Sequence, residues 1–515
     1  MAANAGWTYE ILGEEHMKTR ILIFVVPVLL VVLGGQGSLN AQCTPSGHVF
    51  NLEPLQNTSL DSQGDESLAF LLNRSGGSND LVVGTAVDAR PLYDPSLPSN
   101  DAFYVGRDSS NCAAAVDGGM PFIANFEAVS LVGPAMAADP AHDAFFFADI
   151  YFTKSPPDFS EIGVLKSTAT DLLNTTKCPN GTQQNPAPCF EPFAGFADLS
   201  PLNTFLFTPV IAVDQRKTGL GSGDVYVADV DDDSVHGKNQ LAVSACTNAH
   251  LTCGKPAFIS LGQNDVDANP WIQVRPDGVV TISYQHTMVD SKQNVILQHL
   301  FLTCTPKGAP NPPVCGTSVV AAQPKNPALG SAGETTRFYN TRVTHVNRLE
   351  SDGKTITTFL TYAACKVPEI PNLILSLCPK ADVLVTHSTD GKTWSPAEKV
   401  STSPGQQFDG VMALDDSTQT VNIAYYSSEN DREKLRTQIF LAQILPGSTS
   451  VSKPHQLTSA FFDGGYGDHI AVAAAGTGNA GESKVYVHFN NSPVDGSYSG
   501  HPFPIITNTL TLFEY

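Results

Sequence analysis

The chain has 515 residues, of which 42% are hydrophobic and only 15% charged, and its 41 glycines and 36 prolines supply frequent turns. This balance suits many short strands and argues against a disordered chain or a coiled coil. The formal net charge of −21 at pH 7 argues against nonspecific binding to nucleic acid or anionic lipid, because both need a basic surface.

The start of the chain predicts an export signal. After Met17, two basic residues precede an apolar run at 21–33, and residues 38–41 are small or polar, as in a cleavable signal peptide. The apolar run spans about 13 residues whereas a membrane-spanning helix needs about 20, so a permanent anchor is disfavoured. We therefore predict a signal peptide at 17–41, with residues 1–16 a mis-assigned extension ahead of the true start.

A short phrase recurs along the rest of the chain: an apolar run, a turn with Asp, Gly or Asn, and a second apolar run rich in Tyr, Val and Phe. It occurs seven times, at 81–91, 133–152, 210–230, 271–285, 342–362, 411–426 and 469–489. Five turns carry an aspartate, and these are 75, 63, 75 and 63 positions apart. They are Asp139, Asp214, Asp277, Asp352 and Asp415. A repeat of this length, with β-branched and aromatic alternation, predicts one four-stranded blade plus its loops.

The repeat predicts an all-β fold, a single β-propeller of four-stranded antiparallel blades over 65–515, preceded by an N-terminal segment at 42–64. Seven phrases favour seven blades. We expect one blade to be built from both ends of the chain, with residues 509–513 in the closing strand, because closure removes exposed sheet edges.

All ten cysteines follow the predicted signal peptide, and eight fall into close local pairs. An even number in an exported chain favours disulfides, and no pair has the C-x-x-C spacing of a structural zinc site. Three local pairs follow the third strand of a predicted blade. We expect five bridges, Cys43–Cys112, Cys178–Cys189, Cys246–Cys253, Cys304–Cys315 and Cys365–Cys378. Spacing alone does not fix this connectivity.

The most specific motif is LVTHSTDGKTWS at 384–395. In a tight turn between the last two strands of a blade, Asp390 would accept backbone N–H bonds, Gly391 would adopt a positive φ and Trp394 would pack into the blade. The motif residues are Ser388, Asp390, Gly391, Thr393 and Trp394. They resemble the Asp-box (BNR repeat) of secreted bacterial sialidases and related propellers, in a form one residue shorter than S-x-D-x-G-x-T-W. The resemblance spans roughly residues 65–515, favours six blades as the alternative to seven, and implies a structural role on the rim away from the active face.

The resemblance also implies a catalytic constellation. Sialidases hold the substrate carboxylate with three arginines, since a guanidinium pairs with it in bidentate fashion, and use a Tyr/Glu nucleophile and an Asp acid/base. The candidates here are Arg337, Arg342, Tyr425 and Glu429, whereas the usual Arg-Ile-Pro type motif is replaced by Ala-Arg-Pro at 89–91. The alternatives are arginines that protect a sheet edge and a tyrosine that packs at a strand end.

Four carboxylates crowd into DVDDD at 229–233. Asp229, Asp231 and Asp233 are calcium candidates, because calcium prefers clustered oxygen ligands, and a solvated acidic loop is the alternative. The chain has no zinc-binding H-E-x-x-H, no phosphate-binding glycine loop and no serine-nucleophile elbow. Calcium is therefore the one cofactor that the sequence suggests.

A strong fold signature with a poor catalytic one favours a binding module for a glycan or an extracellular protein, because a propeller offers a concave loop-rich face. We expect a monomer that is secreted, periplasmic or on the cell surface, with no nucleic-acid partner and no permanent membrane anchor. The first alternative is an exo-α-sialidase-type glycoside hydrolase with diverged motifs, and the second is a structural cell-envelope protein. Three arginines and a Tyr/Glu pair converging in one pocket would identify the hydrolase.

Overall fold

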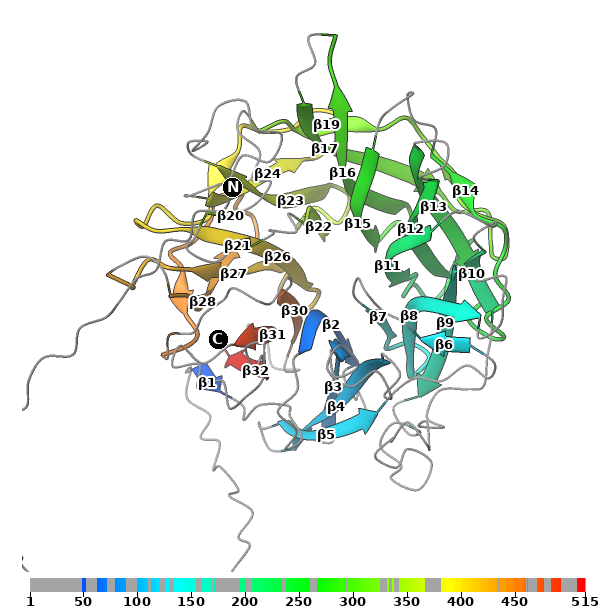
Figure 1. Ribbon diagram of the computed structural model, residues 1–515, viewed down its shortest axis with the longest axis horizontal. Coiled ribbons are helices and arrows are strands. Elements are labelled where there is room, and N and C mark those ends of the chain that lie inside the picture. The colour runs from blue at the N-terminus through cyan, green and yellow to red at the C-terminus, as the bar shows by residue number, and fades with distance from the viewer. Residues whose placement is uncertain are drawn as a thin grey trace, which may run out of the picture. The chain divides into compact units, whose positions relative to one another are not determined.

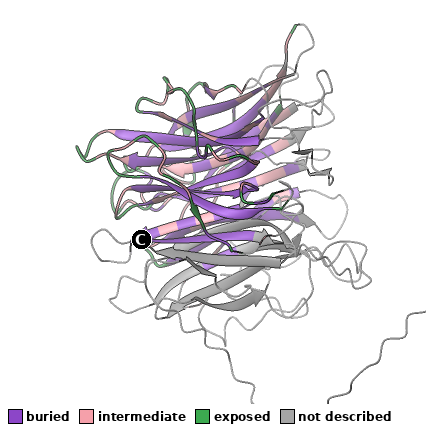
Figure 2. Ribbon diagram, turned by 90° about the vertical axis from the view of Figure 1, so that its left-hand side faces the viewer, coloured by how far each residue is buried: buried purple, intermediate pink, exposed green. Residues whose placement is uncertain are grey.

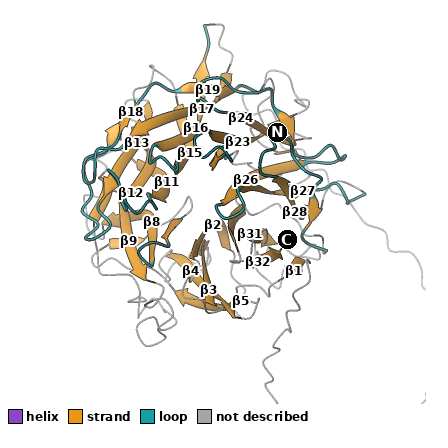
Figure 3. Cartoon of the chain, turned by 180° about the vertical axis from the view of Figure 1, so that it is seen from behind, coloured by secondary structure: helices purple, strands orange, loops and turns teal. Residues whose placement is uncertain are grey.

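The computed structural model divides into two units, Met1–Gln42 and Cys43–Tyr515. The described residues belong to the second unit and are 49–51, 63–71, 79–88, 100–109, 113–119, 126–128, 134–153, 160–168, 171, 195–199, 205–233, 238–259, 266–291, 295–324, 331–332, 336–337, 342–365, 381–432, 436–459, 461, 470–476, 483–491 and 507–514. The elements with described bounds are β-strands joined by loops and turns (Figure 3). Within these ranges, no helix has the length and apolarity needed to cross a membrane.

Most strands form four-stranded antiparallel meanders, which are the blades of a β-propeller. One contains β2 (Gln63–Leu71), β3 (Asn79–Asp88), β4 (Asn100–Ser109) and β5 (Ala113–Gly119). The next contains β7 (Ala135–Asp139), β8 (Ala144–Thr153), β9 (Ser160–Thr168) and β10 (Gly195–Leu199), and β6 (Phe126–Ala128) also pairs with β8.

Two further meanders are joined into one nine-stranded sheet by a parallel bridge between β13 and β15. The first has β11 (Phe205–Val213), β12 (Val225–Asp233), β13 (Lys238–Cys246) and β14 (Ala257–Phe258). The second has β15 (Val266–Val274), β16 (Val280–Val289) and β17 (Val295–Thr305), with β18 (Val314–Cys315) and β19 (Val319–Ala322) both paired to β17.

The remaining strands complete the sheets. One meander has β22 (Thr344–Leu349), β23 (Ile356–Cys365), β24 (Ala381–Ser388) and β25 (Glu398–Lys399), and another β26 (Gln407–Asp415), β27 (Thr420–Ser427), β28 (Gln438–Ile444) and β29 (His455–Gln456). A two-stranded sheet pairs β20 (Ser331–Ala332) with β21 (Thr336–Arg337). The last sheet contains β30 (Ile470–Gly476), β31 (Ser483–Asn491), β32 (Thr507–Glu514) and β1 (Val49–Asn51).

The first strands of the blades form an inner circle. Each contacts the next in the order β2, β7, β11, β15, β22, β26, β30, and β30 contacts β2 again (Figure 1). The last sheet combines both ends of the chain, because β32 pairs with β31 on one side and with β1 on the other, with Phe513 opposite Val49. The predicted closing strand at 509–513 is therefore confirmed.

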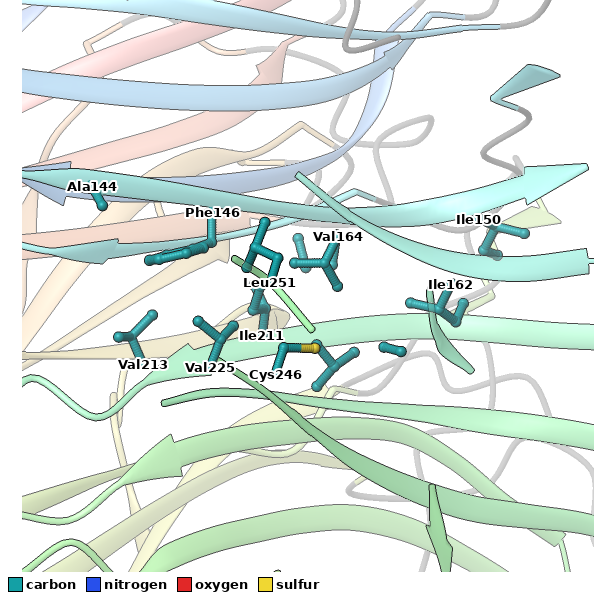
Figure 4. Packing of buried hydrophobic residues seen from close by; sticks show 14 of the residues in the cluster. Ala144, Phe146, Ile150, Ile162, Val164, Ile211, Val213, Val225, Cys246 and Leu251 are labelled. Carbon is teal, nitrogen blue, oxygen red and sulfur yellow. The ribbon is translucent and has the colours of Figure 1, made fainter. Parts of the chain in front are cut away.

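Apolar side chains fill the seams between consecutive blades, and the strands of the described blades are buried along most of their length (Figure 2). In the seam between the β7–β10 and β11–β14 blades, Phe146, Ile162 and Val164 pack against Ile211 and Val225 (Figure 4). Burying each large apolar side chain of this kind contributes about 1.5–3 kcal/mol. The apolar residues of the repeat thus form the contacts between neighbouring blades as well as the strands themselves.

The five repeated aspartates occupy equivalent turns between the first and second strands of their blades. In each turn the aspartate Oδ1 accepts the backbone N–H of the residue two positions on, at 2.8–3.2 Å. The donors are Ala141, Arg216, Val279, Lys354 and Ser417. This Asx-turn geometry explains why the spacing of a single residue type reports the blade repeat.

Disulfides lie in the turn between the third and fourth strands of two blades, where Cys246 is bonded to Cys253 and Cys304 to Cys315, as predicted. Cys365 is also disulfide-bonded, but its expected partner Cys378 lies outside the described residues. The bridges predicted for Cys43–Cys112 and Cys178–Cys189 lie outside them too.

The motif at 384–395 forms the equivalent turn of the β22–β25 blade. Asp390 Oδ1 accepts the backbone N–H groups of Lys392 and Thr393, both at 2.7 Å, and the φ of Gly391 is 67°. Ser388 Oγ accepts the N–H of Gly391 at 2.9 Å. Asp390 and Gly391 thus have the predicted turn geometry, whereas the Trp394 ring contacts Phe301 on β17 of the preceding blade.

Candidate functional site

The two ends of each blade differ in what they connect. In an antiparallel meander, the turn between the first two strands and the turn between the last two lie at one end, here called the hairpin end. The connection between the second and third strands and the connection to the next blade lie at the other, here called the loop end. The repeated aspartates, the disulfides and the Asp390 turn all belong to the hairpin end.

Four inner strands have a register shift near the loop end, namely β2, β11, β15 and β26. In β11, β15 and β26 one residue other than glycine within the shift has a positive φ: Thr208 at 43°, Asn269 at 50° and Asp409 at 51°. Such conformations cost energy and concentrate where a strand must redirect a side chain, often at functional sites.

Ionisable side chains are buried toward the loop end of the second strands. They are Asp149 and Tyr151 on β8, Asp229 on β12, Tyr284 and His286 on β16, and Tyr425 on β27. Burial raises the pKa of Tyr284, to which nearby Asp267 adds. Buried titratable groups with shifted pKa values are a mark of functional sites, although blade packing produces them as well.

Asp229 lies among other carboxyl groups. Burial, followed by the charges of Asp198 and Asp231, raises the pKa of Asp229 well above its ordinary value. Burial and the neighbouring negative charges therefore favour the protonated form of Asp229. The protonated form is a poor ligand for calcium.

No group of three His, Cys, Asp or Glu side chains is arranged to hold a metal ion in the part of the chain that the structure describes. Of the calcium candidates, Asp229 and Asp231 both lie on β12. Asp233 ends that strand, and its side chain is outside the described set.

A histidine and an aspartate form the clearest pair at the loop end. His286 Nδ1 lies 2.8 Å from Asp267 Oδ1; the aspartate side chain is fully buried and the imidazole is 9% exposed. Asp267 is near the start of β15 and His286 near the end of β16, and the two are directly opposite in the antiparallel register. This contact fixes the orientation of the imidazole, which is the role a carboxylate has beside a histidine that binds or transfers protons.

This pair was not predicted from the sequence. Ser283 lies opposite Trp271 and Ala424 opposite Val411, each just after the register shift of its inner strand. SYQH at 283–286 therefore occupies the place of AYYS at 424–427. Aligning the second strands of the blades on this register places His286 at the loop end, at the position that Ser427 occupies in β27.

Tyr425 and Glu429 lie close together, but they differ in access. Glu429 Oε2 accepts hydroxyl hydrogen bonds from Ser401 at 3.2 Å and from Ser427 at 3.1 Å, and its side chain is partly exposed. Tyr425 is completely buried, and burial followed by the charge of Glu429 raises its pKa. Its ring stacks on Phe440, with centroids 5.9 Å apart. In this structure Tyr425 has no exposed surface, whereas Glu429 is partly exposed.

The two candidate arginines, Arg337 and Arg342, both precede β22 in the chain. Arg337 ends β21, where its backbone pairs with Ser331, and its side chain is outside the described set. Arg342 is partly buried just before β22, at the loop end.

Three other arginines are held at the hairpin end. Arg216 bonds Asp214 and the carbonyl of Asp277, and Arg275 bonds the Asp277 carboxylate. Arg348 bonds Glu350 and two carbonyls of the next blade. These three guanidinium groups are therefore at the opposite end of the blades from Arg342.

No protein-family model and no curated protein sequence matches the chain. Among solved structures, the Penicillium chrysogenum α-L-arabinanase complexed with arabinobiose is similar at 10% identity and a TM-score of 0.46, over 78% of this chain and 99% of that one. The polysaccharide lyase Uly1 is similar at 10% identity and a TM-score of 0.46, over 92% and 94% of the two chains. The Hadza microbial sialidase Hz136 is similar at 10% identity and a TM-score of 0.39, over 80% and 73%. The assignment to the β-propeller fold rests on the strand order and the closed circle of inner strands.

Proposed function

We propose that the protein is a secreted β-propeller that binds carbohydrate at the loop end of its blades and lacks a complete sialidase catalytic set. The observation that carries the proposal lies at the loop end, where three inner strands have positive-φ bulges and the Glu429 carboxylate, held by two serines, belongs to a partly exposed residue. Such groups exchange hydrogen bonds with sugar hydroxyls, and a few of them on a rigid scaffold are what orient a ligand. We also propose seven blades, export through the signal at 17–41, and a monomer.

The partly exposed carboxylate of Glu429 is the proposed ligand contact. Two serine hydroxyls hold it in one orientation, which lowers the entropy lost when a sugar hydroxyl donates to it. The backbone N–H of Glu429 itself donates to Ser427 Oγ at 3.1 Å, so the whole turn after β27 is fixed. Asp267 and His286 supply a second oriented polar pair at the same end of another blade.

The positions of the candidate catalytic groups support binding over hydrolysis. A tyrosine nucleophile must reach the anomeric carbon, and the Tyr425 side chain has no exposed surface. Arg216, Arg275 and Arg348 are engaged at the hairpin end, which removes them from any carboxylate-binding triad at the loop end.

The test is a glycan array with neutral, sialylated and uronic acid-containing glycans, probed with the oxidatively folded exported chain. We expect specific binding that Glu429→Gln weakens by about tenfold, the effect of one hydrogen bond to a charged group. Glu398→Gln, an exposed carboxylate on β25, is the matched control and should bind as the wild type does. Absence of binding to every glycan would overturn the proposal.

A parallel assay with a fluorogenic sialoside addresses the hydrolase alternative. Turnover that Arg337→Ala or Arg342→Ala abolishes would establish an exo-sialidase with diverged motifs in place of a binding protein.

A further inference from the structure

The seam between the β15–β19 blade and the β22–β25 blade differs from the other described seams. Its apolar cluster is small, consisting of Phe301, Ala321, Val343, Leu360 and Tyr362 with four partly buried neighbours. Beside this cluster lie two fully buried histidines, His299 on β17 and His345 on β22. Histidine is the side chain whose charge ordinarily changes near pH 6.5, so burying two in one seam has consequences for pH dependence.

His345 is hydrogen-bonded through both ring nitrogens to the neighbouring blade. Its Nδ1 lies 2.7 Å from Ser283 Oγ and its Nε2 lies 2.8 Å from Thr281 Oγ1. Ser283 Oγ also donates to the carbonyl of Val343 at 2.8 Å. With the Ser283 hydrogen used there, Nδ1 is the donor to Ser283. In the neutral imidazole Nε2 accepts from the Thr281 hydroxyl, whose other acceptor is the carbonyl of Gln273 at 3.2 Å.

The network around His345 continues through neutral groups. Asn347 Nδ2 donates to Thr281 Oγ1 at 2.9 Å, and Thr358 Oγ1 donates to Asn347 Oδ1 at 2.8 Å. Trp271 Nε1 donates to the carbonyl of His345 at 3.1 Å. The network is satisfied when the imidazole is neutral. With a proton on Nε2, Thr281 Oγ1 would accept from the ring and donate to the carbonyl of Gln273 at 3.2 Å, so the charged form would cost desolvation and not a hydrogen bond.

His299 is buried with no hydrogen-bond partner for either ring nitrogen among the described residues. Its ring lies against that of Tyr362, with centroids 4.7 Å apart. Gln285 is opposite it on β16 and Ala322 on β19. A charged imidazole here would be both desolvated and unpaired, which is the costliest state for a buried ionisable group.

The described groups that line the two histidines carry no compensating charge. The titratable group that contacts His299 is Tyr362 on β23. Thr281, Ser283 and Gln285 on β16, Trp271 on β15, Phe301 on β17, Ala322 on β19 and Asn347 on β22 are neutral. Burial is the sole cause that lowers the pKa of both His299 and His345 from 6.5 to about 3.

We propose that the seam between the β15–β19 and β22–β25 blades is an acid-sensitive latch, held shut by the neutral forms of His299 and His345 and the first seam of the ring to open when the surroundings become acidic. Opening exposes both imidazoles to water, where they take up protons. Acid therefore favours the open seam, because protons bind to both imidazoles more tightly when the seam is open.

The sign and size follow from proton linkage. Because the pKa values are lower in the closed seam than in an exposed imidazole, the stabilisation is complete above about pH 6.5 and is lost as the pH falls toward 3. Between about pH 5.5 and pH 4.0, each histidine increases the opening equilibrium constant about 25-fold. The seam between the β7–β10 and β11–β14 blades is an internal reference, because it holds the Asp229 carboxyl, whose protonated form burial favours.

The test is hydrogen exchange of the full chain, followed by mass spectrometry, with wild type and variants compared at the same pH. We expect the amides of β16, β17, β22 and β23 to open far more readily at pH 4.0 than at pH 5.5, and those of β12 to change less. His299→Phe keeps the ring against Tyr362 and removes both nitrogens, so it should be at least as stable as wild type at pH 7.5. It should reduce the acid-induced opening by about 25-fold.

His345→Gln tests the second group, and His299→Phe decides the proposal alone where His345→Gln does not fold. His250→Gln, an exposed histidine in the Cys246–Cys253 loop, is the matched control and should leave the acid response unchanged. The opening equilibrium constant of wild type is compared with that of His299→Phe at pH 5.5 and at pH 4.0. If the ratio of the two constants were the same at both pH values, the proposal would be overturned. Acid-induced exchange that begins in β12 or β27 would do so as well.

Discussion

Trp394 meets Phe301 edge to face, with ring centroids 5.2 Å apart and ring planes at 73°. Trp394 belongs to the hairpin-end turn of the β22–β25 blade, whereas Phe301 lies on β17 of the preceding blade and is 1% exposed. The turn is thereby fixed to its neighbour through an aromatic contact as well as by its own hydrogen bonds. A motif that is local in the sequence has its packing partner more than 90 positions away.

Removing either ring should destabilise the seam, and removing both should cost less than the sum. Phe301→Ala is expected to lower the free energy of unfolding by about 3–5 kcal/mol, and Trp394→Ala by less because the indole is partly exposed. The double variant should recover a coupling energy of about 0.5–1.5 kcal/mol. Urea unfolding of the four proteins of the cycle measures this, and additive losses would contradict a direct contact.

The Asp390 turn should respond to pH in a predictable direction. Backbone N–H groups of Thr393 and Lys392 lower the pKa of Asp390 below its usual value of 3.8. A depressed pKa means that the ionised carboxylate contributes stability above about pH 4 and that this contribution is lost as the pH falls through the folded-state value. Asp390→Asn should therefore be less stable than wild type at pH 7, and the difference should shrink in acid, as measured by thermal unfolding at each pH.

Asp352 is a second aspartate that accepts hydrogen bonds within a turn, between the first and second strands of the same blade. The Thr355 hydroxyl, followed by backbone N–H groups, lowers its pKa. Asp352→Asn should show the same trend with pH. If its stability difference from wild type grew as the pH fell, hydrogen bonding to the ionised carboxylate would not be the cause.

These hairpin-end features are the part of the fold that the sequence predicts best, for a physical reason. An Asx turn needs an acceptor at one position and a positive-φ turn needs a glycine, so each leaves a residue type at a fixed place, as at Asp277 and Gly278 or Asp390 and Gly391. The cysteine pairs that follow third strands belong to the same class of local signal.

Arg348, which the sequence analysis does not single out, should contribute strongly to stability. It is 1% exposed, its Nη1 and Nη2 donate to the carbonyls of Leu445 and Ser448 at 3.0 and 2.7 Å, and its Cζ lies 4.6 Å from the ring centroid of Phe359. Arg348→Met keeps the aliphatic stem but leaves two carbonyls and the Glu350 carboxylate unpaired, which should cost about 3–5 kcal/mol. Thermal or urea unfolding provides the value.

The control for that variant is Arg275→Met. Arg275 pairs with Asp277 at the surface, with side chains 23% and 43% exposed, so its loss should cost under about 1 kcal/mol. Equal losses for the two variants would show that the interblade carbonyl contacts of Arg348 contribute nothing measurable.

Gly278 and Gly353 form a matched pair for testing interblade packing. Both have positive φ, 87° and 66°, and occupy equivalent turns, but a Cβ on Gly278 would lie 1.9 Å from Arg216 Cζ whereas one on Gly353 would meet nothing within 4 Å. Gly353→Ala should cost only the conformational strain, about 1–2 kcal/mol. Gly278→Ala should lose more in urea unfolding, because it also displaces Arg216 from the Asp277 carbonyl.

Most of the contacts that the sequence did not predict join strands of different blades. His299 meets Tyr362, and Arg348 meets carbonyl groups about 100 positions further along the chain, and in neither case does the pairing leave a repeating spacing. The carbonyl partners of Arg348 have no side-chain identity at all, so composition and motif cannot reveal them. Asp267 and His286 are close in sequence, but the pair becomes visible only once the register of β15 and β16 is known.

Tyr425→Phe separates the binding role from a hydrolytic one most directly. The substitution removes one hydroxyl from a fully buried side chain whose ring still stacks on Phe440, so the fold and glycan binding should be unchanged to within about twofold. Glu429→Gln should weaken binding in the same titration, because the carboxylate is partly exposed and held by two serines. The opposite result would be that Tyr425→Phe abolished turnover of a fluorogenic sialoside while Glu429→Gln left glycan binding intact. In that case the packing around Tyr425 must open to admit substrate, and the buried tyrosine would be the nucleophile.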